Sequence, residues 1–346
     1  MEHNFIPGVG TLGLISAVGF GVSLYNQTND DILYKDMLNK NIAILVDSSV
    51  QIEESFCKEN HIFSVPLSLS YSSADTTDSN SQKALLDDGK EITREKLFSL
   101  QEENKSFKTA STPLGILTVK VEELLETYDQ VVFFPISHGL SGQYASSLIV
   151  KADLDDQNKF HTVKTTLCVD ATFFVIKSFI NNINNGVSTE EAVKIAEQEY
   201  HTCDTYFGVK NVKTLVNSGR IGKVASMVLN VAHLTPILTV DYSDGKIHKV
   251  AIGTSFKKNV TKIIKCLEKD YEGITLNKET ITDIRILDGG ISLEQKNYIR
   301  EEISNAFGFA KESILISLVP IIILCHTGEG AYGIEVKTNT PYSRKV

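Results

Sequence analysis

The sequence predicts two α/β domains, the first built on a mainly parallel sheet and the second on a mixed sheet. Its 346 residues exceed one ordinary domain of about 100–200 residues. The composition, with 42% hydrophobic residues, 22% charged residues and only 7 prolines, is that of a globular chain. Short apolar runs alternate with segments whose apolar residues recur every three or four positions, which is typical of strand–helix–strand units.

The first domain begins at residue 41. Continuous apolar runs predict buried strands at residues 42–46 and 131–136, a further strand is expected at residues 166–169, and residues 63–69 are expected to be extended. Helices are expected at residues 52–60, from Pro113 to about residue 125, and at residues 145–152. The last of these helices is predicted from an apolar stripe, namely Ala145, Leu148, Ile149 and Ala152. The tract at residues 72–82 is rich in Ser, Thr, Asp and Asn and predicts a loop.

The pattern changes after a helix that a capping box at Ser188 and Glu191 opens and that runs to about His201. Residues 237–242 and 247–252 flank a glycine turn and predict an antiparallel hairpin. The remaining elements are expected to be helices at residues 255–269 and 293–304, and strands at residues 283–287, 314–324 and 333–336. We therefore predict domains at residues 41–203 and 204–346, with residues 1–40 as an accessory extension.

Apart from Glu2, the first 29 residues carry no Asp, Glu, Lys or Arg. Residues 8–13 match the dinucleotide fingerprint G-x-G-x-x-G, but a proline precedes them and no adequate strand leads into them. Glycines dilute the run too much for a typical membrane span, and no positive charge marks a secretory signal. A docked or mobile accessory segment is the plainer interpretation, and transient membrane contact is the alternative.

Composition also limits the class of function. A net charge of −9 gives no basic field for nucleic acid. The five cysteines are widely spread without a C-x-x-C pair, which indicates a reducing cytoplasm and neither a disulfide framework nor a zinc cluster. A phosphate-binding G-x-x-x-x-G-K-[ST] loop and an H-E-x-x-H pair are both missing from the sequence. We expect neither a metal nor a cofactor.

Two strand-to-helix turns carry hydroxyl groups. The first contains Ser111, Thr112 and Pro113, and the second contains Ser141 and Gly142. Helix N-termini attract anions, and such turns gather at the carboxyl ends of parallel strands. If the two strands are neighbours, Ser111 and Ser141 converge on one small oxyanion. The alternative is a pair of ordinary helix caps, because Ser and Thr favour that position in any case.

Two further residues come from the second domain. Gly219 is expected to stop a helix, so that Arg220 leaves the turn with a guanidinium suited to a carboxylate or phosphate. His326 is expected to leave a buried strand into a glycine-flanked loop. Arg220 as a helix-dipole partner and His326 as a structural histidine remain alternatives. Ser141 with His326 as nucleophile and base is a further alternative, although no G-x-S-x-G elbow is present.

Seven short motifs occur in an order that resembles the DegV family, over residues 41–340. They are V-D-S-S (46–49), V-P-L (65–67), D-G-K-E-I (88–92), K-T-A-S-T-P (108–113), G-L-S-G-Q-Y (139–144), S-G-R-I (218–221) and H-T-G-E-G (326–330). The resemblance implies two α/β domains with a long-chain fatty acid in an apolar tunnel between them. It also implies a non-catalytic, cytoplasmic subunit that presents the fatty acid to a separate ATP-dependent fatty acid kinase, for phospholipid synthesis.

By the same resemblance, Ser111, Ser141 and the backbone of Gly142 would bind the carboxylate, His326 would complete the network and Arg220 would support it. The family usually has T-S-Q-P where residues 110–113 read A-S-T-P, so Thr112 is a second candidate for the hydroxyl. Many members carry an arginine linked to kinase docking, and residues 249–255 contain none. The competing hypothesis is an enzyme that acts on a small anionic substrate with His326 and Ser141.

Overall fold

The computed structural model describes residues 41–73, 83–87, 91–221 and 235–341. Its first sheet is entirely parallel, with strand order β2-β1-β6-β7. The strands are β1 (Ile42–Asp47), β2 (Ile62–Val65), β6 (Gln130–Phe134) and β7 (Phe160–Thr162). Every residue of β1 is buried, because helices cover both faces of the sheet. The predicted apolar runs at 42–46 and 131–136 are therefore confirmed as buried strands.

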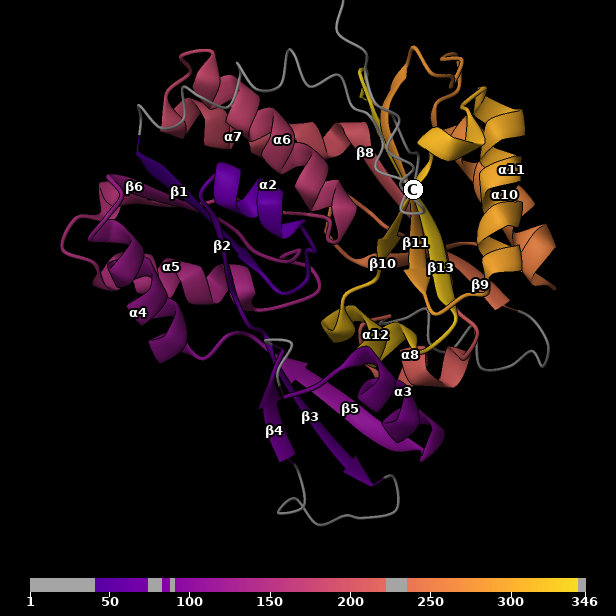
Figure 1. Cartoon of the computed structure of the whole chain (residues 1–346), viewed down its shortest axis with the longest axis horizontal. Coiled ribbons are helices and arrows are strands. Elements are labelled where there is room, and N and C mark those ends of the chain that lie inside the picture. The colour runs from indigo at the N-terminus through magenta and orange to yellow at the C-terminus, as the bar shows by residue number, and fades with distance from the viewer. Residues whose placement is uncertain (1–40, 74–82, 88–90, 222–234, 342–346) are drawn as a thin grey trace, which may run out of the picture.

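Helices α4 (Leu114–Leu125) and α5 (Gln143–Asp153) cover one face of the parallel sheet, where Leu117 and Val150 pack against Leu45 and Phe133. The other face is covered by α2 (Glu54–Glu59), α6 (Asp170–Asn184) and α7 (Thr189–Glu199). Helix α6 also contacts the second sheet, so it is buried between the two sheets (Figure 1).

The second sheet is mixed, with strand order β10-β9-β8-β13-β11-β12. Only the β11–β12 pair is parallel. The strands are β8 (Cys203–Gly208), β9 (Thr235–Val240), β10 (Ile247–Gly253), β11 (Ile281–Gly289), β12 (Leu315–Leu318) and β13 (Ala331–Thr338). Helices α10 (Phe256–Asp270) and α11 (Leu293–Phe307) cover its outer face, as Figure 1 shows. The predicted α/β fold with a parallel and a mixed sheet is confirmed.

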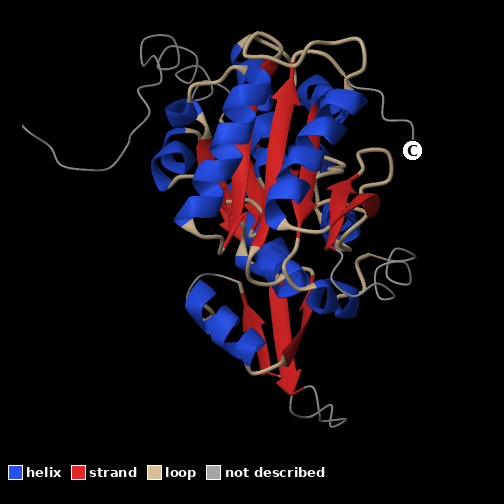
Figure 2. Ribbon diagram, turned by 90° about the vertical axis from the view of Figure 1, so that its right-hand side faces the viewer, coloured by secondary structure: helices blue, strands red, loops and turns tan. Residues whose placement is uncertain are grey.

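A third, small sheet projects from the molecule (Figure 2). It is antiparallel, with β3 (Ser68–Ser73) between β4 (Lys83–Leu86) and β5 (Lys105–Ala110). Helix α3 (Arg94–Glu102) packs on β5. The strand that leads to Ser111 therefore belongs to this small sheet and is not a neighbour of β6 in the parallel sheet.

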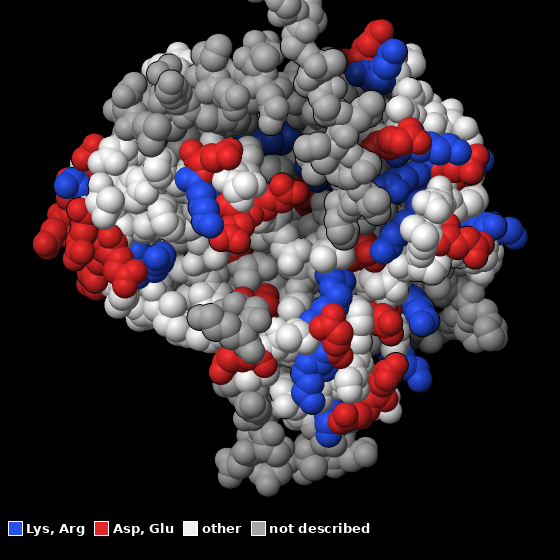
Figure 3. Space-filling view, viewed as in Figure 1, with Lys and Arg blue, Asp and Glu red and all other residues white. Residues whose placement is uncertain are grey.

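The remaining helices are short. Helices α8 (Val212–Asn217) and α12 (Ile321–Thr327) contact each other. Three 3₁₀ helices are Gln157–Lys159, Tyr200–Thr202 and Lys311–Ser313. On the face of the molecule seen in Figure 3, Lys and Arg side chains are interspersed with Asp and Glu. None of the helices in the described ranges is long and apolar enough to cross a membrane.

Two sequence predictions of local structure were wrong. Residues 166–169 form no regular strand, since β7 ends at Thr162 and the following segment pairs only irregularly, through Ser137 N–H to the Leu167 carbonyl and His138 N–H to the Thr165 carbonyl. Residues 321–324 belong to α12, which begins directly after Pro320 at the N-cap. The run of β-branched isoleucines favours a strand by residue type, so the sequence pattern did not indicate this helix. Residues 63–69 are extended as predicted, with Pro66 between β2 and β3.

The apolar stripe on α5 correctly predicts a helix but not its orientation. Leu148 and Ile149 are exposed, whereas Gln143, Ser147 and Val150 face the sheet. The division into domains at residue 203 stays a prediction, because one hydrophobic cluster continues from the parallel sheet through α6 to β8 and β9. The extension at residues 1–40, with its glycine fingerprint, and most of the polar tract at 72–82 lie outside the described residues.

Candidate functional site

A mostly apolar pocket lies where the parallel sheet, the small sheet and the mixed sheet meet. Its empty volume is about 860 Å³, open solvent at the mouth included. The inner face of the mixed sheet supplies one wall, with Phe207 from β8, Val240 from β9 and Leu287 from β11. Cys168 and Val169, just before α6, supply another. Both walls exclude water from whatever occupies the pocket.

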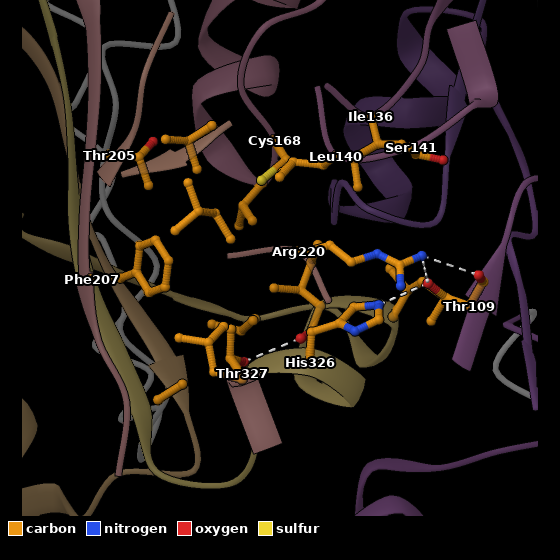
Figure 4. A pocket seen from close by; sticks show the side chains of 18 of the residues that line it. Thr109, Ile136, Leu140, Ser141, Cys168, Thr205, Phe207, Arg220, His326 and Thr327 are labelled. Carbon is orange, nitrogen blue, oxygen red and sulfur yellow. Dashed lines mark hydrogen bonds between the residues drawn. The ribbon is translucent and has the colours of Figure 1, made fainter. Parts of the chain in front are cut away.

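Four polar side chains of the pocket gather at one end, whereas the hydroxyl of Thr205 lies at the other end and donates to Glu335 at 2.8 Å (Figure 4). Figure 4 shows Thr109, Ser141, Arg220 and His326 on one side, and Phe207 far from them. These four residues come from β5, the loop before α5, the turn after α8, and α12. Ligand sites of this kind hold an apolar body against apolar walls and fix its orientation with a few polar groups.

Thr109 is the centre of the polar end. Its hydroxyl lies 2.7 Å from Nε2 of His326. Arg220 donates from Nη2 to the same hydroxyl oxygen at 3.4 Å and to the Thr109 carbonyl oxygen at 3.3 Å. The three side chains therefore form one network that links β5, α8 and α12.

His326 is held in its neutral form. Burial and the nearby guanidinium of Arg220 lower the pKa of His326 from 6.5 to about 3. The ring nitrogen Nδ1 is buried and has no hydrogen-bond partner among the described residues. A buried polar atom without a partner is costly, so this nitrogen is a candidate contact for a polar ligand group. The sequence placed His326 after a strand, whereas the structure places it in the last turn of α12.

Arg220 follows the helix stop that the sequence predicts. Helix α8 ends at Asn217, and Gly219 has a φ of 72°, a left-handed conformation that favours glycine. Arg220 donates from Nη1 to the Ser218 carbonyl at 2.7 Å, which fixes its course toward Thr109. The guanidinium is half-buried, and burial lowers its pKa from an ordinary value far above neutrality, so it remains a cation.

Ser111 lies close to the loop that carries Ser141, although the strands that precede the two serines lie in different sheets. The Ser111 hydroxyl oxygen lies 3.5 Å from the position that a Cβ on Gly142 would occupy. Ser141 lines the pocket, and its hydroxyl accepts a hydrogen bond from the Gln143 N–H at the start of α5. Ser111 itself does not line the pocket among the described residues but stands beside it.

Thr112 has a different role from its neighbour. Its backbone N–H donates to Oε1 of Gln143 at 2.9 Å, and its hydroxyl accepts from Nε2 of Gln143 at 3.0 Å. Both side chains are buried. This pair of hydrogen bonds joins the start of α4 to the start of α5 and holds the Thr112 side chain against Gln143.

Asp47, at the end of β1, anchors the segment that leads from β6 into the loop that carries Ser141. Oδ2 of Asp47 accepts from the Ile136 N–H at 2.7 Å, and Oδ1 accepts from the hydroxyl of Ser49 at 2.6 Å. Burial raises the pKa of Asp47 to about 6, while these hydrogen bonds oppose the rise. Asp47 thus positions the loop without reaching the pocket.

Thr109 is a site residue that was not predicted from the sequence. Alternation along β5 places Thr109 two positions before Ser111, which was the available signal. Its decisive partner, His326, lies 217 positions away and is visible only in three dimensions. Within the described ranges, no group of three or more His, Cys, Asp or Glu side chains is arranged to hold a metal ion.

The fold and the site define an α/β protein of two main sheets with an apolar pocket that is polar at one end. A family model described as "Uncharacterised protein, DegV family" matches residues 41–339. The chain therefore belongs to the DegV family, as the sequence motifs predicted.

Relatives and solved structures agree with this assignment. A DegV domain-containing protein of Ureaplasma parvum is 26% identical over 307 residues, which cover 88% of this chain and 97% of the relative. Protein DegV of Bacillus subtilis is 25% identical over 300 residues, covering 85% and 98%. The structure of a Thermus thermophilus DegV protein, described by its fatty acid binding, aligns with a TM-score of 0.71 at 21% identity, covering 86% and 99%. A stearic-acid-binding protein of Eubacterium ventriosum aligns with a TM-score of 0.72 at 20% identity, covering 86% and 98%.

Proposed function

We propose that the protein binds a long-chain fatty acid, with the acyl chain in the pocket and the carboxylate at its polar end. The observation that carries this proposal is the separation of apolar walls from a single polar network at Thr109, Arg220 and His326. The fatty acids named for the Thermus and Eubacterium proteins support the same ligand class.

The acyl chain supplies most of the affinity in this proposal. Each methylene moved from water to an apolar wall contributes about 0.8 kcal/mol, part of which the ordering of the chain offsets. The walls that would contact the acyl chain are apolar, with Phe207, Val240 and Leu287 from the mixed sheet. At the apolar end of the pocket, a branched or bulky polar group would find no set of side chains comparable to Thr109, Arg220 and His326.

The carboxylate would be held by groups from both halves of the chain. Arg220 supplies a half-buried positive charge, and Thr109 and Ser141 supply hydroxyl groups that line the pocket. His326 supplies the buried nitrogen Nδ1. Ser111 and the backbone N–H of Gly142 stand at the start of α5, where the helix dipole favours a negative charge. Thr112 is not part of this proposed set, because its side chain is buried against Gln143 and does not line the pocket.

The proposed biological role is that of a non-catalytic, cytoplasmic subunit. The protein would present the carboxylate to a separate ATP-dependent fatty acid kinase, and the product would enter phospholipid synthesis. This part rests on the resemblance to family members that serve such kinases. We likewise propose that residues 41–203 and 204–346 act as two domains with the ligand between them, and that residues 1–40 are accessory to both.

The competing enzyme hypothesis is weaker on geometry and charge. A general base works best with a pKa near the working pH, whereas the pKa of His326 lies at about 3. The hydroxyl of Ser141 accepts a hydrogen bond from Gln143, and His326 contacts Thr109 instead of Ser141 among the described residues. A neutral, buried histidine is better suited to binding than to proton abstraction.

Extraction of the natively purified protein with organic solvent, followed by mass spectrometry, tests the ligand. We expect a long-chain fatty acid in nearly stoichiometric amount. An empty extract, together with no uptake of added palmitate or oleate, would remove the proposal. The double variant Ser111→Ala/Ser141→Ala should weaken binding of the acid much more than binding of its methyl ester, whereas equal losses would show that these hydroxyls do not contact the carboxylate.

The kinase partnership needs a separate experiment. Incubation with ATP and the host's fatty acid kinase catalytic subunit should convert the bound acid to an acyl phosphate. If the fatty acid is bound but no turnover occurs, the role reduces to storage or transport, and the ligand proposal stands.

A further inference from the structure

Helices α4 and α5 present an apolar surface to solvent. The two helices lie side by side on the outer face of the parallel sheet (Figure 1). The exposed fractions of its large side chains are 44% for Leu114, 37% for Ile116, 53% for Val119, 44% for Leu148 and 57% for Ile149. Ala145 and Ala152 are exposed on the same stripe of α5. We call these seven residues the α4–α5 face.

This face is unusual because α5 turns its apolar stripe outward and its polar side chains inward. Gln143 and Ser147 are fully buried, while Leu148 and Ile149 are exposed. A helix of a soluble domain normally buries its apolar stripe. Exposed apolar surfaces often mark interaction sites, so the α4–α5 face is a candidate interaction surface.

The same chain contains an apolar segment that the described fold does not use. Residues 3–29 carry no Asp, Glu, Lys or Arg, and residues 5–25 include many Leu, Ile, Val and Phe side chains. Such a segment gains free energy by leaving water, as does the α4–α5 face. An uncharged segment also meets no repulsion from the exposed carboxylates near the ends of the two helices, Glu122, Glu123 and Asp153. Those carboxylates disfavour an anionic lipid surface.

The start of the described chain lies next to this face. The Asn41 side chain donates from Nδ2 to the carbonyl of Thr127, directly after α4, at 3.0 Å. The Asp129 N–H donates to the Asn41 carbonyl at 2.8 Å. Helix α4 is about 18 Å long at 1.5 Å per residue. The 15 residues at 26–40 can extend to about 50 Å, so residues 5–25 reach every part of the face.

We propose that residues 5–25 of the same chain dock on the α4–α5 face and cover it. A face and an apolar segment of one molecule, joined through Asn41, meet at an effective concentration that a separate partner rarely matches. The face adjoins the start of α5 at Gly142, so the docked segment would lie beside the proposed fatty acid site. The inference does not depend on the identity of the ligand.

Cysteine labelling of the full-length chain tests this docking. Ile149→Cys places a thiol on the face, and Leu293→Cys places a matched thiol on α11, where the native side chain is 69% exposed. Each cysteine variant is made in the otherwise unchanged chain and also together with the double substitution Ile15→Asp/Val18→Asp, which makes residues 5–25 more polar. Maleimide labelling is followed peptide by peptide, so the five native cysteines do not interfere.

We expect Ile149→Cys to react at least about fivefold more slowly than Leu293→Cys, and Ile15→Asp/Val18→Asp to abolish that difference without changing Leu293→Cys. Equal rates at the two sites in the otherwise unchanged chain would overturn the proposal. Protection of Ile149→Cys that rises with protein concentration would identify a second copy as the occupant instead. Protection that requires phosphatidylcholine vesicles would identify a lipid surface. Either result overturns docking by residues 5–25.

Discussion

The hydroxyl of Thr109 lies 2.7 Å from Nε2 of His326, across a separation of 217 positions in the chain. The contact joins the small sheet to α12, and α3 reinforces it from the same side. Gln101 donates from Nε2 to the Leu324 carbonyl at 2.9 Å and accepts from the Glu329 N–H at 3.2 Å. Arg94 donates to the Val319 carbonyl at 2.6 Å. The small sheet and α3 thus hold both ends of α12 and determine where His326 lies.

Thr109→Val should lower the affinity for a fatty acid. The substitution keeps the shape of the side chain but removes the hydroxyl that lines the polar end of the pocket, and a hydrogen bond to a charged group contributes about 1.5–3 kcal/mol. This corresponds to a loss of about 10- to 150-fold in a binding titration. The methyl ester, which carries no charge, should lose less.

Thr327→Val is the matched control for this change. Thr327 also lines the pocket, but its hydroxyl donates only to the Ile323 carbonyl of its own helix among the described residues. We expect less than a threefold change in affinity. Similar losses for both variants would show that Thr109 has no particular role at the polar end.

Thr112→Val should lower stability and leave binding unchanged. The variant leaves the buried Nε2 of Gln143 without an acceptor, which costs about 1–3 kcal/mol in the free energy of unfolding measured with urea. Thr112→Ser keeps the hydroxyl and should lose less. The opposite outcome, a loss of affinity at unchanged stability, would place Thr112 on the carboxylate and contradict the assignment of Ser111.

His326→Gln should change the pH dependence of stability. The pKa of His326 is lowered to about 3 by burial and by Arg220, whereas the unfolded side chain titrates near 6.5. Between these values the unfolded chain binds a proton that the folded chain does not. The free energy of unfolding therefore falls as pH drops from about 6.5 toward 3, by at most about 1.4 kcal/mol per pH unit from this group.

Urea unfolding of both proteins between about pH 4.5 and pH 7.5 measures this effect. The difference between wild type and variant isolates His326 from carboxyl groups such as Asp47. The pKa of Asp47 is raised to about 6, so this group acts in the opposite direction, and its contribution falls as pH rises through that value. Parallel curves for the two proteins would show that His326 titrates normally in the fold.

Local sequence patterns predicted the buried parallel strands and the hairpin because those elements depend on short-range periodicity. The runs at Ile42 and Val131 are apolar throughout and are buried from both sides. The sequence failed where tertiary contacts decide. The β-branched side chains of residues 321–323 favour a strand. Pro320 at the N-cap, and the hydrogen bond from Gln101 of α3 to the Leu324 carbonyl, accompany a helix there instead.

The candidate site was predictable only in part. Ser111, Ser141, Arg220 and His326 follow recognisable turns or glycines, so each could be selected as a residue type suited to an anion. Thr109 and the Thr112–Gln143 pair could not be selected in this way, because their roles depend on partners in other elements. The outward stripe of α5 shows the same limit, since periodicity gives the stripe but not its direction.

Gly139→Ala should destabilise the junction between the loop before α5 and the β9–β10 turn. A Cβ on Gly139 would overlap the carbonyl oxygen of Asp244, which is backbone and cannot rotate away. The Ser137 hydroxyl donates to the Gly245 carbonyl at 2.7 Å, and this hydrogen bond should be lost as the turn is displaced. We expect a loss of about 1–3 kcal/mol in the free energy of unfolding, together with faster amide exchange in the turn.

Gly115→Ala is the matched control, because a Cβ there has nothing within 4 Å and lies in the first turn of α4. Alanine favours a helix over glycine by up to about 1 kcal/mol, so this variant should be as stable as the wild type or more so. The turn that Gly139 contacts also precedes Ile247, which lines the pocket. Gly139→Ala should therefore weaken fatty acid binding as well, and an unchanged affinity at reduced stability would show that the turn adjusts without moving the pocket wall.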